Sequence, residues 1–104
     1  MATTASGFDW DKGNRDKCQK HGVSIVDIEG MFARRLFMFP DVRHSGDEER
    51  FKAIGTGETG RHVLIVFMLR DREGETLIRP ISARYMHQQE IAYHEEEAAK
   101  TENR

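Results

Sequence analysis

Residues 62–69 constrain the fold more than any other part of the chain, because they are almost continuously apolar. The run is far shorter than the ~20 residues that cross a bilayer, and it is typical of a strand covered on both faces. Turn-forming sequences flank it, Gly57-Glu58-Thr59-Gly60 on one side and Asp71-Arg72-Glu73-Gly74 on the other. These turns predict two hairpins, so the run is expected to be the central strand of an antiparallel meander.

Four further segments have the composition of strands. Residues 50–55 and 76–83 are the predicted neighbours of the central strand across the two hairpins. Residues 36–39 predict a short strand that stops at Pro40, and Phe8-Asp9-Trp10 predicts a short edge strand. The meander is therefore expected to contain about four strands.

Helices are predicted on either side of this sheet sequence. Residues 11–20 have Asp11 as a helix N-cap and Gly22 at the left-handed position after the helix. A second helix is expected from Ser24, whose hydroxyl can cap it while Asp27 completes a capping box. Its apolar side chains recur at helical spacing: Ile25, Ile28, Met31 and Phe32. Residues 86–100 predict a closing helix with a strongly acidic outer face.

The order is two N-terminal helices, an antiparallel sheet of about four strands and a C-terminal helix. It indicates an α+β fold in two layers, with helices covering one face of a twisted sheet and the other face partly open. A chain of 104 residues is expected to form a single domain, which we place at residues 8–100. Residues 1–7 are expected to be disordered, and residues 101–104 form a tail.

Charge is unevenly distributed, although the whole chain carries only −2. Residues 90–104 contain five acidic and two basic side chains, whereas the remaining 89 residues have a net charge of +1. Broad nonspecific binding to duplex nucleic acid is therefore not expected, while a local basic pocket is compatible with this balance. The N-terminus has no signal-peptide pattern, and the single cysteine, Cys18, fits a reducing cytoplasm.

Arg79 and Arg84 in the last predicted strand are the first candidates for a binding site. They flank Pro80-Ile81-Ser82-Ala83, and an arginine in a strand is costly unless it has an anion to hold. In an unbroken pleat the two side chains would point to opposite faces, whereas a bulge or edge position at Pro80 would give them a shared direction. The alternative for Arg79 is an ion pair with an acid on another element. Arg70 ends the central strand and adds a third guanidinium, suited to a phosphate or to a neighbouring acid.

Lys20 and His21 fall at the predicted C-terminal end of the first helix, where the helix dipole favours cations. A protonated histidine beside a phosphodiester can act as a general acid toward the leaving oxygen. Cations and one imidazole together suit an RNA phosphate and predict a small ribonuclease. The alternative is that both residues only complement the helix end. A clear general base is missing, and the candidates are Glu48, Glu49 and Tyr93.

The polar segment His44-Ser45 with Asp47-Glu48-Glu49 contains residue types that bind metals. Its spacing matches no recognisable metal motif, so a solvated loop is the preferred interpretation. His87 and His94 are seven residues apart on the last predicted helix, which is two turns rather than one, and they cannot easily share a metal. No metal site and no cofactor are expected.

The chain also resembles the BrnT-type toxins of bacterial type II toxin–antitoxin systems. The resemblance runs from residue 8 to about residue 97 and depends on the order and spacing of short motifs. These motifs are Phe8-Asp9-Trp10-Asp11 with Lys12, Lys20-His21-Gly22-Val23, His44-Ser45 followed by Glu48-Glu49-Arg50, Ile54-Gly55, Ile81-Ser82-Ala83-Arg84, Glu90 and Tyr93.

The resemblance implies a fold similar to that of RelE-like ribonuclease toxins, and RNA cleavage that arrests translation. It also implies a BrnA-type antitoxin partner with a ribbon-helix-helix domain. The complex would repress its own operon, with DNA contacted only through the antitoxin. The family positions expected to matter for activity map to Lys20, His21, Arg70, Arg79 and Arg84.

The leading hypothesis is a cytoplasmic, metal-independent ribonuclease toxin that its antitoxin neutralises by covering the active face. His21 would act as acid or base, Arg70 and Arg84 would clamp the phosphate, and Lys20 would assist. The alternative is a noncatalytic toxin-like module that pairs with an antitoxin-like DNA-binding regulator, favoured by the near-neutral charge and the missing general base. A third hypothesis is a metal-dependent hydrolase that uses His44 and nearby acids, and the absence of a metal motif disfavours it.

Overall fold

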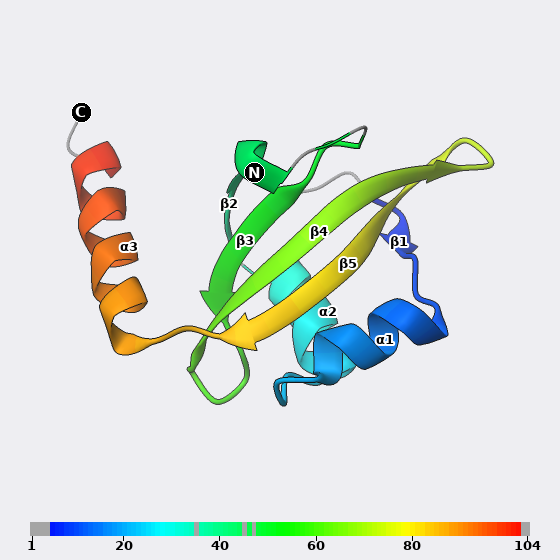
Figure 1. Cartoon of the computed structure of the whole chain (residues 1–104). Helices are drawn as coiled ribbons and strands as arrows, with labels where there is room; N and C mark the ends of the chain where they lie inside the picture. Colours follow the sequence, from blue (N-terminus) through cyan, green and yellow to red (C-terminus); the bar gives the residue numbers. More distant parts are fainter. Residues whose placement is uncertain (1–4, 35, 45, 47, 103–104) are drawn as a thin grey trace.

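The computed structural model describes residues 5–34, 36–44, 46 and 48–102, which form a five-stranded sheet with helices around it (Figure 1). The elements in chain order are β1 (Gly7–Phe8), α1 (Lys12–Gln19), α2 (Ile25–Ala33), β2 (Phe37–Pro40), the 3-10 helix η1 (Val42–His44), β3 (Phe51–Thr56), β4 (His62–Arg72), β5 (Glu75–Tyr85) and α3 (Gln88–Glu102). The strand order is β1-β5-β4-β3-β2, with β1 parallel to β5 and the other neighbours antiparallel. The predicted α+β class is confirmed, and the sheet is mixed because β1 adds a parallel edge strand.

The sheet begins before residue 8, the predicted start of the domain. The Ser6 amide donates a 2.8 Å hydrogen bond to the carbonyl of Thr76, and Gly7 pairs with Leu77. At the other end, α3 continues to Glu102. The described residues do not include residues 1–4, which belong to the segment predicted to be disordered. They also do not include residues 103–104 of the predicted tail.

The hairpin between β4 and β5 is tighter than the four-residue turn predicted at residues 71–74. Only Glu73 and Gly74 form the turn, with φ values of 53° and 83°. Two consecutive positive φ values match the twist of the flanking strands, so the ladder continues to the pair formed by Arg72 and Glu75. Both strands therefore run longer than predicted.

The core lies between α1 and α2 and one face of the sheet. Its buried members are Cys18, Val23, Ile28 and Met31 from the helical segment, and Ala53, Val63, Ile65, Phe67, Ile78 and Ala83 from the strands. Burial raises the pKa of the Cys18 thiol to about 11, so the cysteine remains a neutral packing residue at pH 7. No helix in the described part of the chain is long and apolar enough to cross a bilayer.

Local capping interactions place the two N-terminal helices as predicted, with one exception. Asp11 and Asn14 form a reciprocal capping box at the start of α1, and Gly22 has a φ of 92° after its end. Ser24 caps α2 by accepting from the Asp27 amide at 3.1 Å. The Asp27 carboxylate does not complete the predicted capping box, because it turns to the β3–β4 hairpin and accepts from the Glu58 amide at 2.8 Å.

A β-bulge in β5 decides which side chains share a face of the sheet. Val66 pairs with Ser82 and Phe67 pairs with Pro80, so Ile81 is the extra residue. Beyond the bulge, Arg84 lies opposite Leu64, while Arg79 lies opposite Met68 before it. Because Leu64 and Met68 are four residues apart, both arginines point to the same face. The bulge alternative considered at Pro80 is therefore confirmed.

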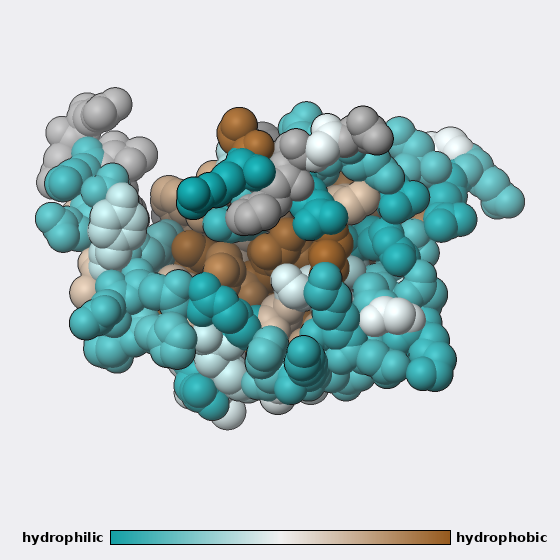
Figure 2. All heavy atoms as spheres, viewed as in Figure 1, coloured by the Kyte–Doolittle hydropathy of each residue, from teal (hydrophilic) through white to brown (hydrophobic). Residues whose placement is uncertain are grey.

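That shared face is the one opposite the core. In Figure 1 it is turned toward the reader, with α2 behind the sheet and η1 in front of it. Figure 2 shows apolar surface exposed over β3 and β4 on this face, bordered by hydrophilic side chains. The helix α3 stands at one side of the same face and does not cover it (Figure 1). The partly open sheet face was predicted from the order of the elements.

Candidate active site

Arg84 is held by Glu90, the third residue of α3. The two side chains form a bidentate pair, with Nη1 and Nη2 donating to Oε1 and Oε2 at 2.8 and 2.7 Å. Glu90 also accepts from the His87 amide at 2.9 Å, which caps the start of α3. The hydrogen bonds from Arg84, together with that amide, lower the pKa of the Glu90 carboxyl to about 2. The same pair raises the pKa of the Arg84 guanidinium.

Arg79 and Arg70 are paired with carboxylates as well. Arg79 donates to Asp11 at 2.8 Å and lies 3.5 Å from Asp9, which is the alternative considered for it from the sequence. The amide of Asn14 and then Arg79 lower the pKa of Asp11. Arg70 lies 3.3 Å from Glu48, one of the three candidates for a general base. A preformed pocket of three free guanidinium groups is therefore absent from the described residues.

The register of β4 and β5 also separates the three arginines along the sheet. Arg84 lies opposite Leu64, and Arg70 is six residues further along β4, which is about 20 Å at the rise of a strand. Arg79, opposite Met68, is about 13 Å from Arg84 by the same measure. In the structure Arg79 and Arg70 are therefore spaced away from Arg84 and held by acids of their own. Arg79 lies in the middle of β5, and Arg70 lies further along, near the β4–β5 hairpin.

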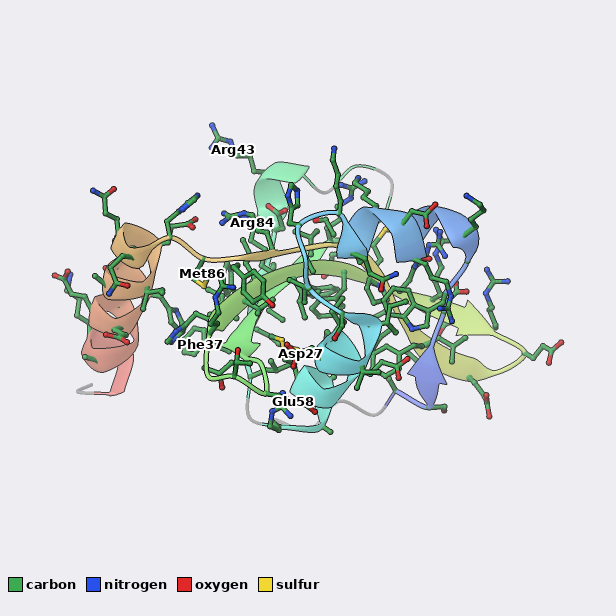
Figure 3. The ribbon with its side chains drawn as sticks, turned by 90° about the horizontal axis from the view of Figure 1, so that it is seen from below. Asp27, Phe37, Arg43, Glu58, Arg84 and Met86 are labelled. Carbon is green, nitrogen blue, oxygen red and sulfur yellow. The ribbon has the colours of Figure 1, made fainter. Side chains whose placement is uncertain are left out.

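Lys20 and His21 lie at the Arg84 end. The loop that follows α1 runs beside the C-terminal end of β5 in both views (Figures 1 and 3), and a Cβ at Gly22 would be 3.9 Å from the Tyr85 ring. Both Lys20 and His21 are exposed. Neither side chain has a hydrogen-bond or ion-pair partner within the part of the chain that the structure describes. The fold thus leaves one lysine and one imidazole available next to the end of β5.

Arg61 is a further cation at this end that sequence analysis missed. Its guanidinium lies over the Tyr85 ring, with Cζ 3.6 Å from the ring centroid. The pairing of Val63 with Tyr85 places the residue just before β4 against the end of β5. The only signal in the sequence was a basic residue adjoining the central strand. We call the set Lys20, His21, Arg61, Arg84 and Tyr85 the β5-end cluster.

The remaining candidates lie elsewhere. Glu49 is exposed in the segment before β3, and Tyr93 is exposed on α3. Ser45 and Asp47, named with His44 as possible metal ligands, lie outside the described residues, as does the side chain of His44. Among the described residues, no group of three or more His, Cys, Asp or Glu side chains is arranged to hold a metal ion.

Comparison with known protein families gives a match over most of the chain. A family model described as "Ribonuclease toxin, BrnT, of type II toxin-antitoxin system" matches residues 10–90. The matched segment begins at Trp10 and ends at Glu90, so it contains the whole β5-end cluster and the partner of Arg84. No curated protein matches the chain.

Proposed function

The chain belongs to the BrnT family of ribonuclease toxins from type II toxin–antitoxin systems, and from this premise we propose that it cleaves RNA at the β5-end cluster. We further propose that cleavage needs no metal ion and arrests translation in the cytoplasm. The observation that carries the location is the position of Lys20 and His21, which lie beside the end of the strand that holds Arg84 and have no partner among the described residues.

Metal-free cleavage of RNA requires charge stabilisation on the phosphoryl oxygens and a proton for the leaving 5′ oxygen. Lys20, Arg61 and Arg84 supply three cations on neighbouring segments. His21 is exposed beside them and is the group we assign to proton transfer. Arg70 and Arg79 remain predicted family positions, and we assign them no contact with the phosphate that is cleaved, because each is held by acids of its own.

A phosphate that takes the bidentate position on Arg84 must displace Glu90 from the two Nη atoms. The Arg84 side chain is 38% exposed and that of Glu90 is 35% exposed, so solvent and an incoming anion can reach the pair. A phosphate offers Arg84 the same bidentate geometry as the carboxylate. A phosphate can therefore replace the Glu90 carboxylate as the partner of Arg84.

The antitoxin partner is proposed to be of the BrnA type, with a ribbon-helix-helix domain. In this proposal the complex binds operator DNA through the antitoxin, and the toxin contacts DNA only indirectly. The chain's slightly acidic net charge of −2 agrees with a toxin that makes no extensive contacts with duplex DNA.

The test is cleavage of a single-stranded RNA substrate by the purified chain in the presence of EDTA, with incorporation of labelled amino acid followed in a bacterial host. His21→Ala and Lys20→Ala are expected to abolish or strongly reduce cleavage. Lys17→Ala is the matched control, because Lys17 is exposed on the same helix one turn before the cluster. Cleavage that stops in EDTA, or that survives in the His21 and Lys20 variants, would contradict the proposal.

A noncatalytic toxin-like module is the second candidate. The observation in its favour is that Arg70, Arg79 and Arg84 are all paired with carboxylates. This function predicts a folded chain that binds its antitoxin tightly but neither cleaves RNA nor slows translation.

A further inference from the structure

A groove separates α3 from the open face of the sheet. Its volume is about 490 Å³, and its apolar walls are formed by Phe37, Phe39, Ile54 and Leu64 from the sheet and by Met86 and Tyr93 on the other side. Figure 3 shows Phe37 and Met86 lying between α3 and the sheet. Phe37 is 42% exposed and Tyr93 is 66% exposed, although both are large apolar side chains. We call this feature the α3 groove.

The contacts that bridge the groove include the Arg84–Glu90 pair at the start of α3 and an edge-to-face contact between Phe37 and His94, with ring centroids 5.0 Å apart. Beyond these contacts, α3 stands beside the sheet and does not cover it (Figure 1). Any molecule that packs against both walls at once would fix α3 in place, and with it the Glu90 partner of Arg84.

The charge along α3 indicates which class of molecule can bind in the α3 groove. The helix Gln88–Glu102 contains five glutamates and a single lysine. Within the groove Glu90 is paired with Arg84 and Lys52 is also present, so the negative charge lies mainly along the exposed side of α3 that borders the groove. Carboxylates in this number repel the phosphates of RNA. They attract a polypeptide that carries lysine or arginine beside apolar anchors. The groove therefore suits a protein partner and disfavours nucleic acid.

We propose that the antitoxin inserts an apolar segment, flanked by basic residues, into the α3 groove. The inference builds on the proposed function, because the family places this chain in a system with an antitoxin partner. By packing against α3 and the sheet together, the segment keeps Glu90 on Arg84. Neutralisation then follows from holding the arginine in its ion pair, without covering Lys20 or His21.

The binding test uses the purified chain and the antitoxin of its own system, measured by titration calorimetry. Tyr93→Lys places a cation in the groove and is expected to weaken antitoxin binding by at least about 30-fold, as for a central interface residue. Val26→Lys is the matched control, because Val26 is an exposed apolar residue on α2, 72% exposed and outside the groove. Circular dichroism establishes that both variants fold. Equal affinity of Tyr93→Lys and Val26→Lys would overturn the proposal.

Lysine footprinting tests the same proposal without a substitution. Lys52 lines the groove, whereas Lys20 belongs to the β5-end cluster. In the complex, Lys52 is expected to lose its reactivity toward an amine-specific reagent while Lys20 keeps it. Protection of Lys20, alone or together with Lys52, would overturn neutralisation through α3. Neither measurement depends on RNA cleavage. The absence of cleavage and the absence of antitoxin binding in the α3 groove can therefore be told apart.

Discussion

The buried side-chain amide of Asn14 donates a 2.9 Å hydrogen bond to the carbonyl of Pro80, joining α1 to the bulge of β5. The same amide donates to the Asp9 carbonyl at 2.9 Å, and its oxygen accepts from the Asp11 amide at 2.7 Å. The carbonyls of Thr76 and Ile78 on this edge of β5 accept from the Ser6 and Asp9 amides, and Asn14 supplies the donor for the next one, Pro80, where β1 has ended. One side chain thus joins the start of α1 to the edge of β5 beside the bulge.

Replacement of Asn14 by alanine should destabilise the protein by about 2 kcal/mol or more, because it leaves buried polar groups unsatisfied. Chemical denaturation measures this change. Gln19→Ala on the exposed side of the same helix removes a single 3.1 Å side-chain hydrogen bond and serves as the control, with an expected effect within about 0.5 kcal/mol. Equal stability of the two variants would show that Asn14 does not stabilise the junction of α1 with β5.

The carboxyl group of Glu90 should titrate at a much lower pH than a free glutamate carboxyl group. Its pKa is lowered from 4.5 to about 2, chiefly by Arg84. Since the folded-state pKa is the lower one, the contribution of the pair to stability is fully present above about pH 4.5 and is lost as the pH falls toward about 2. Carboxyl carbon chemical shifts followed by NMR give the midpoint. In Arg84→Ala the midpoint should move up toward 4.5, and a wild-type midpoint already near 4.5 would mean that the pair does not form in solution.

Arg84→Ala should lower the rate of RNA cleavage, whereas Glu90→Gln should raise the affinity for RNA. Loss of Arg84 removes a cation from the phosphoryl oxygens and should lower the cleavage rate by about 100-fold or more. Glu90→Gln removes the charge that holds Arg84 and should raise RNA affinity, as measured by fluorescence anisotropy with a labelled oligonucleotide. A Glu90→Gln variant that binds RNA normally but does not cleave it would give Glu90 a part in the chemistry instead.

Arg79→Ala should lower cleavage much less than Arg84→Ala, by less than about tenfold against about 100-fold. Arg79 lies in the middle of β5 and is held by Asp9 and Asp11. Single-turnover cleavage rates of the two variants, compared at equal folded concentration, test this separation. Equal losses would show that RNA contacts the whole row of arginines during the reaction.

Gly57→Ala should destabilise the β3–β4 hairpin, because a Cβ at this position would overlap with the Asp27 carboxylate. Crowding of this kind costs about 1–3 kcal/mol. The penalty should be smaller in an Asp27→Ala background, and a double-mutant cycle by chemical denaturation measures the coupling. Gly46→Ala is the control, because a Cβ there would have no atom within 4 Å.

Most elements of this fold could be predicted from short-range patterns. Asp11, Ser24 and Gly22 mark helix ends because their capping interactions involve residues only two to four positions away. The apolar run at residues 62–69 predicted the central strand because burial on both faces demands such a sequence. The predicted position of the β4–β5 turn was wrong by only a few residues. The error arose because Glu73 adopts a positive φ, which its residue type does not favour.

The candidate site needed the tertiary structure. Composition and spacing indicated Lys20, His21, Arg70, Arg79 and Arg84, and the family match over residues 10–90 agrees with a ribonuclease toxin. Which of these side chains can meet depends on a bulge at Ile81 and on the register of β4 with β5. The carbonyl of Pro80 finds its partner 66 residues away in Asn14, and no local pattern encodes such a pairing.

The sequence by itself determined the order of helices and strands, the central strand and the types of residue available for chemistry. Only the tertiary structure decided that Lys20, His21 and Arg61 lie at the Arg84 end of β5, while Arg79 and Arg70 lie further along the β4–β5 ladder. It alone placed Glu90 on Arg84. The physical reason is that secondary structure follows from interactions within a few residues, whereas ion pairs, registers and grooves form between segments that meet only after folding.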